Sequence, residues 1–114
     1  MAGSFQIESQ AGAQPGHRIL RMSGRLGLDT VPEFLKEIRA ANDPVVILDF
    51  TELSYIDSAG VGSLVQTLAT LKKSDRRLAL AAVNDRVRAV LEITRVHNLF
   101  PHFATLGEAE EKLR

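Results

Sequence analysis

The chain contains no cysteine, which excludes disulfide scaffolds, thiolate catalysis and zinc-thiolate sites. It also has no excess of charge of either sign, because 14 basic residues balance 14 acidic ones. A balanced total gives no general attraction to nucleic acid or to anionic membrane surfaces. We therefore expect no nucleic-acid partner.

Long apolar runs are absent as well. The longest have the length of a strand, far short of a bilayer span, so we expect no membrane insertion. The first ten residues, MAGSFQIESQ, lack the basic segment and apolar run of a signal peptide. These absences predict a cytoplasmic protein. A length of 114 residues with 45% hydrophobic content predicts one domain with one core over residues 1–114.

Apolar patterning predicts the strands. Residues 4–8 alternate, and turn residues separate them from a second apolar segment at 18–22, which favours an antiparallel pair. The runs VVILDF (45–50) and RLALAAV (77–83) do not alternate, which is typical of parallel strands covered on both faces. A short last strand follows around His102, and TELSYID (51–57) is predicted to be a loop.

After most of these strands, apolar residues recur at helical spacing, which predicts a helix there. Residues suited to cap the helices stand before three of them: Thr30 with Glu33 in a capping box, Asn84, and Thr105 with Glu108. The remaining helix runs from Ser58 to about residue 73. The predicted order is β-β-α-β-α-β-α-β-α, an α/β fold with a mostly parallel sheet of about five strands and four helices.

The stretch YIDSAGVGSL, from Tyr55 to Leu64, raises the question of function. Asp57 and Ser58 are both suited to cap the following helix, and Gly60 permits close packing. A nucleophile elbow would need glycine at the position of Ile56, and no histidine stands at a spacing that supports a triad. The spacing also matches no Gly-rich phosphate loop. We therefore expect no enzyme, no cofactor and no metal site.

Modification of Ser58 is a sharper interpretation. Phosphorylation adds a charge of about −1.5 to −2, which the dipole at a helix N-terminus stabilises. The domain would keep its fold, and the effect would fall on whatever docks over Ser58. This arrangement suits a switch.

The stretch LDFTELSYIDSAGVGSL (48–64) strongly resembles the signature of the STAS family, in particular the bacterial anti-sigma factor antagonists. RMSGRL (21–26) and LFPHFATLGEAEEKL (99–113) resemble flanking parts of the same family. The resemblance implies a compact fold of successive βα units. It also implies a function: the unmodified domain binds a kinase-type anti-sigma factor, this partner phosphorylates Ser58 with ATP, and a separate phosphatase resets the system.

Two other interpretations stay open. In the first, the chain is a STAS module that is never phosphorylated and serves as a fixed subunit of a lipid-transport or stress-sensing assembly. In the second, the chain itself binds a nucleotide. One departure from the family bears on the choice. The family often has G-E-L-D after the second strand, whereas Arg25 and Gly27 replace the two acidic residues here.

The predicted partner surface surrounds Ser58. It includes the only tyrosine, Tyr55, an amphipathic residue that suits a partner contact, and helix residues expected to be exposed. Its members are Ser54, Tyr55, Asp57, Ser58, Ala59, Gly60, Ser63, Gln66 and Thr67. A separate basic cluster, KKSDRR (72–77), is interpreted as a solvated turn whose lysines suit a helix C-terminus.

Overall fold

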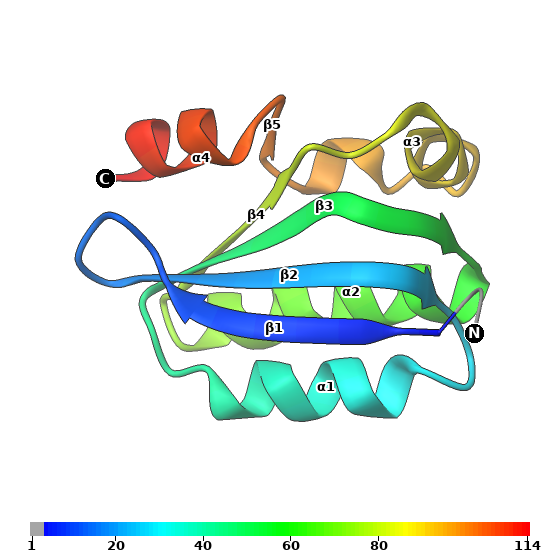
Figure 1. The fold of residues 1–114 in the computed structure, drawn as a ribbon, viewed down its shortest axis with the longest axis horizontal. Helices are drawn as coiled ribbons and strands as arrows, with labels where there is room; N and C mark the ends of the chain where they lie inside the picture. Colours follow the sequence, from blue (N-terminus) through cyan, green and yellow to red (C-terminus); the bar gives the residue numbers. More distant parts are fainter. Residues whose placement is uncertain (1–3) are drawn as a thin grey trace.

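The computed structural model describes residues 4–114. Figure 1 shows the elements in chain order, and they match the predicted order. They are β1 (Gln6–Ala11), β2 (His17–Leu26), α1 (Val31–Ala40), β3 (Val45–Ile56), α2 (Ser58–Lys73), β4 (Arg77–Ala81), α3 (Asp85–Ile93), the 3₁₀ helix η1 (His97–Leu99), β5 (His102–Phe103) and α4 (Leu106–Leu113).

The five strands form one sheet in the order β1-β2-β3-β4-β5. β1 pairs antiparallel with β2, and the remaining neighbours pair in parallel. The predicted α/β fold with a mostly parallel sheet and four helices is confirmed, and the sheet is mixed because of β1.

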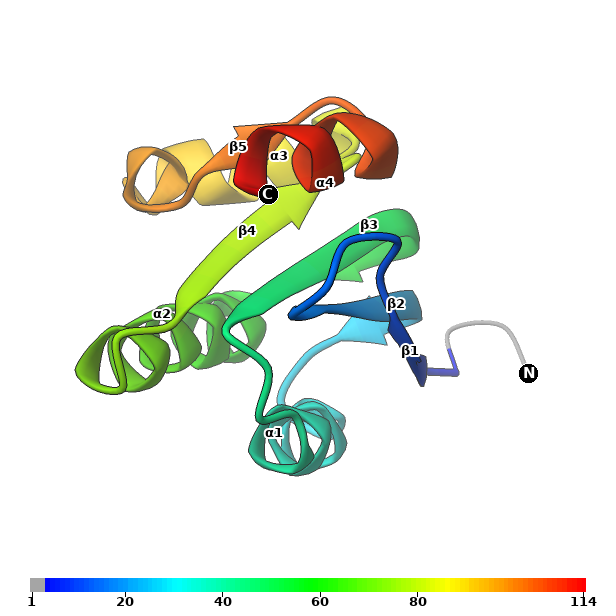
Figure 2. The ribbon, with the colours of Figure 1, turned by 90° about the vertical axis from the view of Figure 1, so that its left-hand side faces the viewer.

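Helices cover both faces of this sheet. Figures 1 and 2 show α1 and α2 together on one side and α4 on the other. Alternate residues of β3 explain its unbroken apolar run: Val46 and Leu48 belong to the larger core, whereas Ile47 packs in a smaller core with Ala109 and Leu113 of α4. Each such residue is removed from water, and burial of this kind drives folding.

β3 is longer than its apolar run, so the predicted loop at 51–57 is wrong. The strand continues to Ile56, where it pairs with Leu26 of β2. The ladder has two register shifts, and the second, between Leu53 and Tyr55, lets Leu53 and Ile56 both enter the core although they are three residues apart. The ladder brings the end of β2 beside the start of α2.

Two of the three predicted side-chain caps are confirmed. The side chains of Asn84 and Thr105 accept hydrogen bonds from N–H groups in the first turns of α3 and α4. The predicted capping box at Thr30 is wrong, because its hydroxyl makes no cap bond to α1. The Thr30 hydroxyl instead accepts from the Gly27 N–H and donates to the Arg25 carbonyl, both at 2.9 Å. It thereby orders the β2–α1 loop.

Within residues 4–114, no helix is long and apolar enough to cross a bilayer. The same part of the chain holds no group of three or more side chains suited to a metal ion.

Candidate functional site

Ser58 is the first residue of α2, and its side chain is exposed. Asp57 is the N-cap: its Oδ1 accepts a hydrogen bond from the Gly60 N–H at 2.9 Å. Of the two residues suited to cap this helix, Asp57 therefore has that role. The Ser58 hydroxyl is left at the helix start without a capping function.

The second oxygen of Asp57 contacts another loop. Oδ2 accepts a hydrogen bond from the Leu28 N–H at 3.2 Å, and the Asp57 N–H donates to the Leu26 carbonyl at 3.2 Å. Asp57 thus holds the β2–α1 loop against the first turn of α2.

The pKa of Asp57 lies below its ordinary value of 3.8. The main cause is the hydrogen bond from the Gly60 N–H, which burial opposes; the Leu28 N–H and the positive charge of Arg25 lower it further. Hydrogen bonds to the ionised form favour that form. At neutral pH the neighbour of Ser58 in the sequence is therefore a carboxylate.

Two glycines allow this close packing. A Cβ on Gly60 would lie 2.4 Å from the Leu26 carbonyl oxygen, and one on Gly27 would lie 2.7 Å from Asp57 Oδ2. A side chain at position 27 would press directly on the Asp57 carboxylate. The departure from the family pattern at Gly27 therefore lets Asp57 contact the loop, and it leaves Asp57 as the acidic group next to Ser58.

The ends of β2 and β3 form the rim of the site. Tyr55 is 38% exposed, and the guanidinium carbon of Arg25 lies 5.1 Å from the centre of its ring. This distance fits a cation–π contact. The Ser54 hydroxyl donates to the Gly24 carbonyl at 2.9 Å. Ser54 and Tyr55 are both exposed strand residues: Tyr55 pairs with Arg25 of β2, whereas Ser54 lies at a register shift and contacts β2 through its hydroxyl.

Two polar helix residues of the predicted partner surface, Ser63 and Thr67, are buried, so the expectation that they are exposed is wrong. Ser63 and Thr67 are 3% and 1% exposed, and Gly60 is buried under the β2–α1 loop. Their burial is tolerated because the Ser63 hydroxyl donates to the Gly60 carbonyl at 2.7 Å, and the Thr67 hydroxyl donates to the Ser63 carbonyl at 2.8 Å. Neither the Ser63 nor the Thr67 side chain is therefore presented to a partner.

In the first part of α2, residues 58–68, the exposed positions form a stripe of Ser58, Gly62 and Gln66, spaced four residues apart. Ala59 beside it is partly buried. Gly62 was not predicted, although no neighbouring atom lies within 4 Å of the position that its Cβ would take. An exposed glycine here lets a partner approach the helix backbone closely.

Leu28 was also missed. Its side chain is 77% exposed, and its backbone N–H contacts Asp57. An apolar residue between Gly27 and Asp29 in a turn was a signal for it, since turns usually carry polar residues. The "switch surface" is defined here as Leu28, Ser54, Tyr55, Asp57, Ser58, Ala59, Gly62 and Gln66.

The three histidines make their hydrogen bonds away from Ser58. The His17 ring contacts Glu110 and the Leu113 carbonyl, and His97 and His102 stack with ring centres 4.1 Å apart. This arrangement offers the Ser58 hydroxyl no histidine base of the kind found in a triad.

Comparison with known proteins gives consistent results. A family model described as the STAS domain matches residues 8–109. The anti-sigma-B factor antagonist of Staphylococcus aureus is 32% identical over 83 residues, which cover 70% of this chain and 77% of that protein.

Solved structures have the same fold. An anti-sigma factor antagonist from Mycobacterium paratuberculosis has a TM-score of 0.85 at 21% identity, covering 96% of this chain and 94% of its own. SpoIIAA in its unphosphorylated form has a TM-score of 0.77 at 24% identity, covering 97% and 96%. The Bacillus SpoIIAA in its phosphorylated form has a TM-score of 0.72 at 24% identity, covering 97% and 100%.

Proposed function

The chain belongs to the STAS domain family, and from that membership we propose that it is an anti-sigma factor antagonist regulated by phosphorylation of Ser58. The unmodified protein binds a kinase-type anti-sigma factor through the switch surface. This partner transfers a phosphoryl group from its own ATP to the Ser58 hydroxyl. The complex then dissociates, and a phosphatase restores the unmodified form.

One observation carries the proposal. Ser58 is exposed at the start of α2, while Asp57 supplies the cap. Modification of the hydroxyl therefore removes no hydrogen bond that α2 needs to begin. The free N–H groups and the dipole of the helix stabilise a phosphate at this position. The domain can accept the charge without unfolding.

The surroundings of Ser58 explain release of the partner. A phosphate adds about −1.5 to −2 beside the ionised Asp57, so a partner would face a concentrated negative charge. The exposed Leu28 side chain offers an apolar contact at the same place. A partner that buries Leu28 would have to desolvate the phosphate next to it, at a large cost in free energy.

The relatives support this function. The Staphylococcus aureus relative is named an anti-sigma-B factor antagonist, and SpoIIAA, which has the same fold, was solved both without and with phosphorylation. Since bacterial transcription takes place in the cytoplasm, our proposal includes that this protein acts there.

The experiment begins with identification of proteins that co-purify with the tagged chain. The captured anti-sigma factor is then incubated with ATP and the chain, and the intact mass of the chain is measured. We expect a gain of one phosphate that is lost in Ser58→Ala and retained in Ser74→Ala. Ser74 is a matched control because it is an exposed serine at the other end of α2.

No mass gain with a kinase that is active on another substrate would contradict the switch. Stable co-purification with a transport or stress-sensing assembly, unaffected by ATP, would indicate a fixed structural subunit instead.

A further inference from the structure

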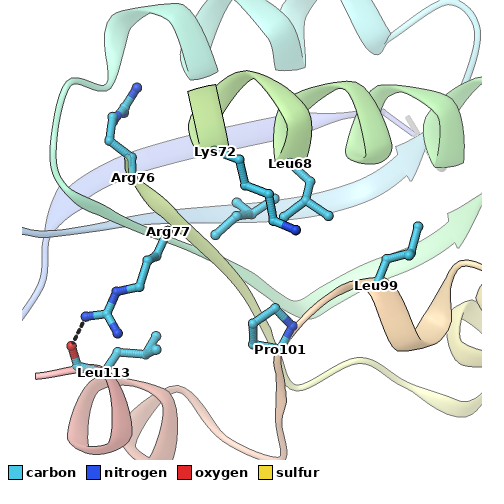
Figure 3. Close-up of a pocket in the computed structure, with 8 residues that line it drawn as sticks. Leu68, Lys72, Arg76, Arg77, Leu99, Pro101 and Leu113 are labelled. Carbon is cyan, nitrogen blue, oxygen red and sulfur yellow. Dashed lines mark hydrogen bonds between the residues drawn. The ribbon is translucent and has the colours of Figure 1, made fainter. Parts of the chain in front are cut away.

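A surface cavity lies at the C-terminal end of α2, away from Ser58 (Figure 3). Its volume is about 240 Å³. β5 begins at His102, opposite Leu80, so the first part of β4 has a neighbouring strand only on its β3 side, and the cavity lies at this uncovered end of β4. Its lining residues are Leu68, Lys72, Arg76, Arg77, Leu78, Leu99, Pro101 and Leu113.

The interior of this cavity is apolar. Leu78 and the two leucines from α2 and α4, Leu68 and Leu113, are buried in the cores. Leu99 in η1 is 50% exposed although it is a large apolar residue. Removing apolar surface from water is favourable, so covering Leu99 with another apolar group stabilises the complex.

The rim of the cavity is cationic. Lys72 and Arg77 are both exposed, and Figure 3 shows the Lys72 side chain near Leu68, with Arg77 extended toward Leu113. The Arg77 Nη2 group donates to the neutral Leu113 carbonyl at 2.6 Å. Within residues 4–114, none of the ion pairs includes Lys72, Arg76 or Arg77. The Arg76 guanidinium donates instead to the neutral carbonyls of Asp43 and Ala41. Lys72 and Arg77 are therefore exposed cations without a paired carboxylate side chain in this part of the chain.

The size of the cavity decides between kinds of ligand. Sites for free small molecules usually have volumes of about 300–1,000 Å³, larger than this cavity. An apolar interior also does not suit a highly charged free metabolite. A pocket that holds one bulky side chain, with charges around it, is typical of an anchor point in a protein interface.

We propose that this cavity is a second docking site, which binds an acidic segment of a partner protein through one bulky apolar side chain. The apolar anchor fills the space between Leu68, Leu99 and Leu113. Carboxylates on either side of the anchor face Lys72 and Arg77, whose charges they complement.

This site is separate from the phosphorylated residue. Lys72 follows Ser58 by 14 positions on the same helix, which is a distance of about 21 Å at a rise of about 1.5 Å per residue. Debye screening over about 8 Å at physiological salt weakens the effect of a phosphate on Ser58 at this range. A partner bound here therefore stays bound whether or not Ser58 is phosphorylated.

The test uses a defined probe, the acetylated and amidated pentapeptide Glu-Glu-Phe-Glu-Glu, titrated into isotope-labelled protein. We expect saturable NMR shifts at the amides of Leu78, Leu99 and Leu113, with a dissociation constant of about 1 mM. Lys72→Glu should abolish saturation. Lys73→Glu, the same charge change on the neighbouring exposed residue outside the cavity, should bind normally, and so should Ser58→Asp.

Several results would overturn the proposal. The first two are the absence of a saturable shift at these amides and equally tight binding of the basic peptide Lys-Lys-Phe-Lys-Lys. The third is binding of octanoate in the cavity without binding of the acidic peptide. The fourth is self-association of the free protein that Lys72→Glu abolishes. Each is independent of whether Ser58 is phosphorylated, so failure here leaves the proposed switch standing.

Discussion

The carboxylate of Asp57 lies 3.2 Å from the backbone nitrogen of Leu28, although 29 positions separate the two residues in the sequence. The same carboxylate caps α2 through the Gly60 N–H. One side chain therefore fixes both the start of the helix that carries Ser58 and the loop that presents Leu28. The apolar and the modifiable parts of the switch surface are held in one geometry.

Removing this carboxylate should destabilise the protein. We expect Asp57→Ala to lower the free energy of unfolding by about 1–2 kcal/mol, because both the cap and the loop contact disappear. Urea unfolding measures the change. Asp29→Ala is the control, since Asp29 is an exposed acidic residue of the adjacent turn and should change little. Equal effects of the two substitutions would contradict the role given to Asp57.

Two glycines of α2 should respond oppositely to the same substitution. Gly60→Ala places a methyl group 2.4 Å from the Leu26 carbonyl oxygen and should destabilise by about 1–3 kcal/mol. Gly62→Ala meets no neighbouring atom within 4 Å and should stabilise by about 0.5–1 kcal/mol, since glycine costs conformational entropy in a helix. Thermal unfolding compares the two variants. Destabilisation by Gly62→Ala would mean that this position is packed rather than open.

Glu110 should make stability depend on pH. Burial alone raises the pKa of Glu110, but hydrogen bonds from the Ala13 and Gln14 N–H groups and from His17 outweigh it, so the net pKa is lowered below 4.5. A carboxyl group with a lowered pKa in the folded state stabilises that state above its unfolded pKa. This stabilisation is lost as the pH falls through the folded pKa.

We therefore expect Glu110→Gln to lower the stability at neutral pH by about 1–3 kcal/mol, because Glu110 hydrogen-bonds the buried His17. The difference from the wild type should shrink on acidification between about pH 5 and pH 3. Urea unfolding across this range is the measurement. Glu111→Gln is the control, because Glu111 is exposed and pairs only with Arg114. A difference that stays constant with pH would contradict this role.

Leu28 should contribute to binding and not to folding. Its side chain is 77% exposed, so Leu28→Ala should change stability by less than about 0.5 kcal/mol. Affinity for the anti-sigma factor should fall at least about tenfold, which corresponds to about 1.4 kcal/mol. Ile93→Ala is the matched control, since Ile93 is 80% exposed at the end of α3. Calorimetric titration is the measurement. An equal loss of affinity in both variants would contradict a role of Leu28 in partner binding.

Local patterns were enough to predict the order of the elements, because strand and helix periodicities depend on residues close together in the sequence. The same holds for two of the three predicted caps. The length of β3 was not predictable in this way. It depends on the pairing of β3 with β2 and on the register shift that lets Leu53 and Ile56 both enter the core. The hydrogen bonds of Thr30 were also not predictable from the local pattern, since its hydroxyl contacts the loop before α1 rather than the helix.

The local geometry around Ser58 was more predictable than the exposure of the helix residues that follow it. Ser58 and Asp57 follow from the motif, but the burial of Ser63 and Thr67 depends on hydroxyl groups that bond back to the helix carbonyls. A polar residue type alone does not reveal this. Leu28 enters the site only through a hydrogen bond between distant segments, which no local pattern contains.

The most direct test measures two properties of the Ser58→Asp variant: its affinity for the anti-sigma factor that binds the wild-type protein, and its thermal stability. An added charge at this exposed helix start should weaken binding by about 100-fold or more, or about 2.8 kcal/mol, while Tm stays within a few degrees of the wild type. Ser58→Ala should bind nearly as well as the wild type, because Asp57 supplies the cap. Unchanged affinity of Ser58→Asp, or a loss of binding accompanied by a large fall in Tm, would contradict the account.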